Sequence, residues 1–145
     1  MPKIGKFKSE EHRGKYMAAY DRVEQLWPST APAQTMDVTT TFGSTHVRRW
    51  GMGTGAPLVL LHPMAGNSLV WHSFAEELGR DRVVYALDTI GTAGKSVQTE
   101  PITKGTDYAT WVDDVLTGHG VLWQMREAVI PKITAFVRTH DEVSA

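Results

Sequence analysis

A turn between an apolar run and a helical pattern is the first place where this sequence could stabilise a charged oxygen. The turn occupies residues 63–67, after the apolar run 58–61. A helix is predicted after it by the apolar spacing of Leu69, Val70, Phe74 and Leu78. Backbone N–H groups at such a turn can point at an oxyanion, and a helix N-terminus adds a favourable potential. The same residues also fit a plain strand-to-helix loop in which His62 and Trp71 only pack. Taken alone, the segment favours the plain loop.

A second loop, residues 88–96, contains glycines in an arrangement that suggests a phosphate site but does not meet its requirements. The phosphate-loop signature needs a glycine five positions before Gly94, where this chain has Thr89. The residues after position 96 are a poor helix start, and Asp88 would place a carboxylate beside any bound phosphate. A nucleotide site is therefore not predicted.

The remaining polar residues form no catalytic or metal-binding pattern. No serine lies in Gly-x-Ser-x-Gly, the sharp turn that exposes a nucleophilic hydroxyl. We expect Ser68 to cap a helix and Ser96 to fix its own loop. The six histidines lack the spacing of a helical zinc site, and the absence of cysteine excludes thiolate ligands and a Cys nucleophile. We expect no cofactor and no metal.

The composition is that of an ordinary folded domain. The 145 residues carry 15 Lys+Arg against 16 Asp+Glu, and 41% are hydrophobic, which indicates one domain and excludes disorder. The balanced charge without a basic run argues against a nucleic-acid partner. No stretch approaches the ~18 apolar residues that a membrane span needs, and no apolar run follows the basic start. We expect a soluble, cytoplasmic protein with no membrane partner.

The elements that must position these loops follow from apolar spacing. Residues 9–26 predict a helix with Ser9 as its N-cap and with Tyr16 and Tyr20 on its apolar face. Residues 28–32 predict a linker, and residues 35–50 a two-stranded hairpin. The runs 58–61 and 83–87 are typical of strands buried on both faces of a parallel sheet. With the intervening helix they form a right-handed βαβ unit. A helix is predicted over residues 107–116, with one apolar face formed by Tyr108, Trp111, Val112 and Val115, and another over 123–139.

Together these pieces resemble the α/β-hydrolase family, in particular a bacterial carboxylesterase-like subgroup. The apolar strand with its His62 loop, Trp71, the loop 88–96 and the helix 108–116 follow the family's order. The loop 88–96 has one more residue between its glycines than the family's pattern. In that family the first loop begins with His-Gly and donates an oxyanion-hole N–H. Here Pro63 replaces the glycine, so the resemblance places His62 in the oxyanion loop and makes the N–H of Met64 the candidate donor.

The family's nucleophile is not found in these residues. After Leu116 the family continues into a strand, the Gly-x-Ser-x-Gly elbow, a lid and the acidic triad member, none of which follows here. The dipeptide Gly118-His119 resembles the one that supplies the family's triad histidine near its C-terminus. His119 also fits an ordinary surface loop after the preceding helix. We favour a front part joined to a tail, with the middle missing; an incomplete gene model would give the same sequence.

The predicted fold is α/β: a truncated α/β-hydrolase-like sheet, made of an antiparallel hairpin plus a parallel βαβ unit and flanked by helices. It has four strands and about four helices, in the order hairpin, 83–87, 58–61. Residues 1–34 are a helical arm and linker, 35–116 a partial core and 117–145 a tail helix. The resemblance implies hydrolysis of a small-molecule ester with an incomplete triad. The alternative is a non-catalytic binding or assembly module, such as a homodimer, that uses the exposed edge of the strand 58–61.

Overall fold

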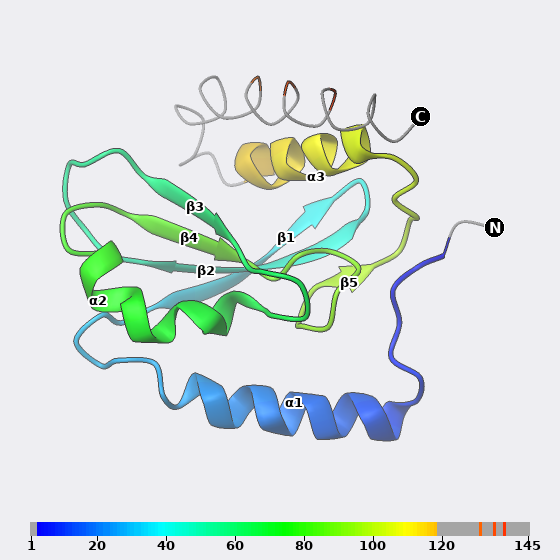
Figure 1. Ribbon diagram of the computed structural model, residues 1–145, viewed down its shortest axis with the longest axis horizontal. Coiled ribbons are helices and arrows are strands. Elements are labelled where there is room, and N and C mark those ends of the chain that lie inside the picture. Colours follow the sequence, from blue (N-terminus) through cyan, green and yellow to red (C-terminus); the bar gives the residue numbers. More distant parts are fainter. Residues whose placement is uncertain (1–2, 119–130, 132–134, 136–137, 139–145) are drawn as a thin grey trace.

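The computed structural model describes residues 3–118 together with positions 131, 135 and 138. Helices lie on both faces of one mixed sheet (Figure 1). Helices α1 (Glu10–Glu24) and α2 (Ala75–Leu78) lie on one side, and α3 (Gly105–Gly118) lies on the other. The predicted tail helix over 123–139 falls almost wholly outside the described residues. Among the described residues, no helix is both long and apolar enough to cross a membrane.

The first helix confirms the prediction closely. Helix α1 covers Glu10–Glu24, and the Ser9 side chain caps it by accepting a hydrogen bond from the His12 N–H. Glu10 and Glu11 lie in the first turn, where carboxylates complement the helix dipole. Only Tyr20 is fully buried along α1, so the helix meets the rest of the molecule along a narrow stripe.

The sheet has the predicted strand order, with one addition. Its path is β1-β2-β4-β3, and a short strand β5 also pairs with β2. The pairs β1–β2, β2–β4 and β2–β5 are antiparallel, whereas β3–β4 is parallel. The strands are β1 Gln34–Thr40, β2 Gly43–Trp50, β3 Leu58–Leu61, β4 Val84–Leu87 and β5 Val97–Gln98.

The two parallel strands differ in burial, which corrects one prediction. Every residue of β4 is buried, as expected for a strand covered on both faces. Strand β3 is only partly buried, and Leu61 is 46% exposed. The reason is position, because β3 ends the path of described strands and has β4 as its only described neighbour.

The crossover between β3 and β4 is not the single α-helix predicted. It is a 3₁₀ segment, η1 (Ser68–Phe74), followed by one turn of α-helix, α2 (Ala75–Leu78). Because a 3₁₀ helix has three residues per turn, the side chains rotate differently from an α-helical pattern. Phe74, expected on the apolar face, is therefore 54% exposed, whereas Trp71 packs partly buried against the core.

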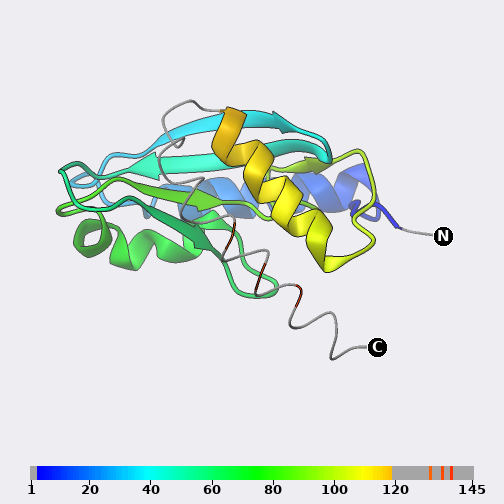
Figure 2. The ribbon, with the colours of Figure 1, turned by 90° about the horizontal axis from the view of Figure 1, so that it is seen from above.

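Hydrophobic clusters fill both faces of the sheet. Helix α3 (Gly105–Gly118) packs Trp111, Val112 and Val115 against one face, as predicted, and it lies obliquely across the strands in Figure 2. Tyr108, predicted on the same apolar face, is instead 42% exposed. On the other face Trp50, Ala75, Val84 and Ala86 form a cluster that Trp27 and Trp71 help to cover. The sheet thus fixes the ends of β3 and β4, where the candidate loops begin.

Candidate functional site

The loop after β3 contains a tight turn whose two central N–H groups, those of Met64 and Ala65, have no acceptor among the described residues. The Gly66 N–H donates to the Pro63 carbonyl at 3.0 Å, so Met64 and Ala65 occupy the two central positions. Ala65 has φ 64°, the left-handed conformation that a type II turn requires at its third residue. The Met64 side chain is 97% exposed. Its N–H donates to no acceptor within the part of the chain that the structure describes.

His62 braces this turn against the loop that follows β4. Its Nε2 accepts the Thr89 N–H at 3.0 Å, and its Nδ1 lies 2.9 Å from the Pro63 carbonyl oxygen. These contacts fit the neutral tautomer with its proton on Nδ1, which donates to Pro63. Both ring nitrogens are therefore engaged, and His62 holds the loop in place rather than serving as a free base.

Asp88 joins three segments at the end of β4. Its carboxylate is fully buried, and Oδ1 accepts the Ser68 N–H at 2.7 Å. Oδ2 accepts the Tyr20 hydroxyl at 2.9 Å and the Lys95 N–H at 2.9 Å. A Cβ on Gly94 would lie 2.8 Å from Oδ2, so only glycine lets the loop approach this closely. A buried carboxylate held by three donors fixes the start of η1 relative to the loop after β4.

Two tyrosines of α1 complete the support of the turn. Tyr20 reaches Asp88, while the Tyr16 hydroxyl donates to the Ala93 carbonyl at 2.8 Å and accepts from Asn67 Nδ2 at 2.9 Å. Their spacing of four places both hydroxyls on one side of the helix. Burial, reinforced by the Asp88 carboxylate, raises the pKa of Tyr20 far above that of a free tyrosine, so it is a permanent donor at neutral pH. The sequence predicted only that these tyrosines lie on the apolar face of the helix, not that their hydroxyls support the turn.

Charged residues attach the C-terminal half of α1 to the sheet. Arg48, which is buried, lies 2.7 Å from Glu24 Oε1 and 5.0 Å from the centroid of the Trp27 ring. Lys95 Nζ lies 3.5 Å from Glu24 Oε2. Burial acts to raise the pKa of Glu24, but the Arg48 guanidinium and the Lys95 ammonium outweigh it and lower that pKa overall.

Neither of the two serines considered from the sequence is placed as a nucleophile. Ser68 is fully buried, and its Oγ lies 3.3 Å from the Tyr20 hydroxyl. The prediction that Ser68 caps the helix is wrong, because the Asn67 side chain is the cap and accepts the Leu69 N–H. Ser96 does fix its own loop: its Oγ donates to the Asp88 carbonyl at 2.5 Å and accepts the His46 N–H at 2.8 Å.

The structure therefore brings together only part of the predicted site. It places His62 next to the turn that holds Met64, while Trp71, in the following segment η1, packs against the core. His119 lies outside the described residues, so its relation to the turn is not observed. Among the described residues there is no group of three or more His, Asp or Glu side chains able to hold a metal ion.

The sequence is similar to bacterial carboxylesterases over part of their length. No family model matches the sequence. It is 33% identical over 107 residues to the uncharacterized carboxylesterase nap of Bacillus subtilis, covering 74% of this chain and 35% of the relative. It is 30% identical over 115 residues to carboxylesterase YbfK of the same organism, covering 79% of this chain and 38% of that protein. The chain thus spans little more than a third of either relative's length.

A solved structure gives the same result. The crystal structure of naproxen esterase from B. subtilis superposes with a TM-score of 0.70 at 31% identity, over 79% of this chain and 39% of the esterase. The superposition extends the sequence match to the arrangement of the strands and helices.

Proposed function

We propose, because this chain belongs to the α/β-hydrolase family, that it supplies the oxyanion loop of a carboxylic-ester hydrolase. These 145 residues contain no Gly-x-Ser-x-Gly elbow that could carry the nucleophilic serine of that hydrolase. The observation that carries the proposal is the Met64 N–H, which has no acceptor among the described residues, in a turn held by His62 and Asn67. The resemblance between this loop and the family's loop after the same strand supports it.

The chemistry follows from where negative charge develops. When a serine oxygen attacks an ester carbonyl, the C=O bond becomes a C–O⁻ bond in a tetrahedral intermediate, which then expels the alcohol. A backbone donor 2.7–3.1 Å from that oxygen stabilises the intermediate, and one such donor is worth about 10²–10³ in kcat. In this chain the Met64 N–H would be that donor. We propose His119 as the triad histidine, the base that takes the serine proton, on the family resemblance alone.

The isolated chain tests the location of the nucleophile. We expect no steady hydrolysis of a short-chain nitrophenyl ester and no covalent labelling by a fluorophosphonate, because a site without its serine retains only a small residual rate. B. subtilis YbfK, prepared alongside, is the positive control. Hydrolysis by the chain that is abolished by one serine-to-alanine change would overturn this placement and identify the nucleophile.

A second candidate function is that of a binding or assembly module. Strand β3 ends the described sheet, contains no charged residue and exposes Leu61. Such an edge is a template for pairing with another strand. We therefore propose a homodimer through β3 as the alternative, which the sedimentation behaviour of a Leu61→Lys variant tests.

Two further predictions remain proposals. We propose that residues 1–34, 35–116 and 117–145 act as arm, partial core and tail, a division supported by the position of α1, which precedes every strand and lies on one face of the sheet (Figure 1). A cytoplasmic location is also proposed, supported by the absence of cysteine from these 145 residues, because disulfides are typical of exported proteins. Limited proteolysis and cell fractionation are the respective tests.

A further inference from the structure

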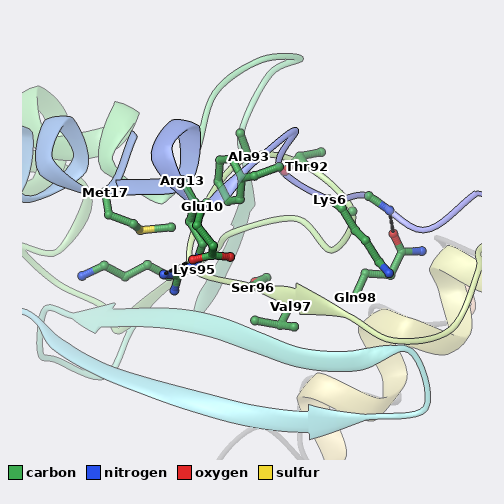
Figure 3. A pocket seen from close by; sticks show the side chains of 14 residues that line it. Lys6, Glu10, Arg13, Met17, Thr92, Ala93, Lys95, Ser96, Val97 and Gln98 are labelled. Carbon is green, nitrogen blue, oxygen red and sulfur yellow. Dashed lines mark hydrogen bonds and ion pairs between the residues drawn. The ribbon is translucent and has the colours of Figure 1, made fainter. Parts of the chain in front are cut away.

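A cavity of about 450 Å³ lies between the N-terminal arm and the loop that joins β4 to β5. Residues 5–7 of the arm, the first two turns of α1 and residues 91–98 form its walls (Figure 3). None of residues 62–67 lines it. The volume is within the range of small-molecule sites in proteins.

Specific contacts fix the arm as one wall of this cavity. The Gly5 N–H donates to Gln98 Oε1 at 2.7 Å. A Cβ on Gly5 would lie 2.3 Å from the Gly91 carbonyl oxygen, so the arm touches the loop backbone there. The Phe7 ring centroid lies 5.4 Å from that of Tyr16. The arm is thus held by the loop at Gly5 and by α1 at Phe7.

The charged lining favours a ligand with a single negative charge. Lys6, Arg13 and Lys95 line the cavity against one carboxylate, Glu10. Lys95 Nζ is already shared with Asp21 and Glu24 of α1, at 3.5 Å each. Two cations then remain to face the ligand.

These two cations are not strongly paired. Arg13 lies 4.0 Å from Glu10, at the limit of an ion pair, and Lys6 has no ion-pair partner in the described part of the chain. Lys6 and Arg13 against Glu10 leave a net charge of about +1, which matches a ligand with one negative charge.

Backbone and apolar groups add to this preference. The N–H groups of Ala93 and Gly94 donate to no acceptor among the described residues, and both residues line the cavity. Phe7, Met17 and Val97 supply apolar surface, and Val97 is 57% exposed. A cavity that combines an exposed apolar side chain with donors lacking a described acceptor suits a ligand with an anionic head and an apolar body.

We infer that this cavity binds a small apolar carboxylate, the chemical class of the acid released by ester hydrolysis. The identification of this carboxylate as a product of ester hydrolysis rests on the proposed function, whereas the binding itself does not. A carboxylate fits better than a phosphate monoester, because the buried Asp88 carboxylate lies behind the Lys95 N–H at 2.9 Å and Glu10 stands at the rim. Both would repel the second charge of a dianion.

An NMR titration of the isotope-labelled chain with 2-naphthoate tests the site directly. For a ligand of this size we expect a Kd of roughly 1 mM, with shifts concentrated at residues 91–98. Neutral 2-naphthamide should bind at least about threefold more weakly, and naphthyl phosphate no more tightly than the carboxylate. Equal affinity for the amide would overturn the anion site, and tighter phosphate binding would overturn the choice of a carboxylate.

Charge variants locate the site without disturbing the core. Lys6→Gln and Arg13→Gln should each raise the Kd about two- to fivefold, the usual effect of one exposed charge. Lys8→Gln changes an exposed arm lysine that does not line the cavity and should leave the Kd unchanged. Absence of shifts at residues 91–98 up to about 10 mM ligand, or an equal effect of Lys8→Gln, refutes the inference. Neither result depends on hydrolysis, so failure here and failure of the proposed function are separable.

Discussion

Replacing Tyr20 by phenylalanine removes one hydroxyl from the network that supports the candidate turn. The ring volume is retained, but Asp88 Oδ2 loses the donor at 2.9 Å and keeps only the Lys95 N–H. A hydrogen bond to a buried charged group contributes about 1.5–3 kcal/mol. We therefore expect Tyr20→Phe to lower the free energy of unfolding by about that amount in urea titrations followed by tryptophan fluorescence.

The control for this experiment is Tyr108→Phe, because Tyr108 is 42% exposed and its loss of a hydroxyl should change stability by less than about 0.5 kcal/mol.

The pH dependence of the free energy of unfolding gives a second test of the same contact. Burial and the Asp88 carboxylate raise the pKa of Tyr20 in the native state, whereas in the unfolded state it ionises near pH 10. Above about pH 10 the native state therefore binds more protons than the unfolded state. Stability falls with rising pH by about 1.4 kcal/mol per unit from this residue.

The phenylalanine variant lacks this term, so the stability gap between the wild type and Tyr20→Phe should narrow above about pH 10. Equal stability of the two proteins at neutral pH would refute the role assigned to Asp88 as a joint held by Tyr20. A gap that stays constant up to about pH 11.5 would refute the burial of an un-ionised hydroxyl.

Other substitutions test the packing, the turn and the sheet edge. Trp111→Phe should cost about 1–3 kcal/mol because the Trp111 Nε1–H donates to the buried Thr45 Oγ1 at 2.7 Å. Trp71→Phe should cost less than about 1 kcal/mol, since its buried Nε1–H has no described acceptor; equal losses in chemical denaturation would contradict this. Ala65→Gly should raise stability by about 0.5–1 kcal/mol, because Ala65 has φ 64°, and a melting curve with no gain would count against the turn. If the wild type sediments as a dimer, Leu61→Lys should make it monomeric, and an unchanged dimer would exclude pairing through β3. Val59→Lys is unsuitable, since Val59 packs against the core.

The strand order could be predicted because it follows from a few strong local signals and the family resemblance. The hairpin, the two apolar runs and the helix at residues 107–116 each show one clear periodicity. Burial of the individual strands was harder to predict. Runs 58–61 and 83–87 look alike in sequence, yet β3 lies at the end of the described sheet while β4 lies between two strands. Burial of a run depends on which strands lie beside it in the sheet, and the sequence of the run alone does not show this.

The supporting contacts of the site could not be predicted for a related reason. Tyr16 and Tyr20 fit an apolar helix face, and only the folded chain brings their hydroxyls to Asn67 and Asp88, 51 and 68 positions away. Adjacent Asn67 and Ser68 are both good N-cap residues, and the Asp88 carboxylate, by taking the Ser68 N–H, favours Asn67 as the cap. Strand β5 has two residues, too few for any periodicity.

The central claim is that Met64 offers a backbone N–H to an oxyanion, and a chimera tests it most directly. The 115 residues of B. subtilis YbfK that match this chain at 30% identity are replaced by the corresponding residues of this chain, and ester hydrolysis is measured in the folded product. Met64→Pro removes the N–H at the second position of the turn, where proline is favoured, so the turn is preserved. Met64→Ala is the matched control that keeps the N–H.

We predict that Met64→Ala changes kcat of the chimera by less than about twofold, whereas Met64→Pro lowers kcat by about 10²–10³. An active chimera whose kcat is the same with proline as with alanine at position 64 would contradict the assignment of this turn as the oxyanion loop.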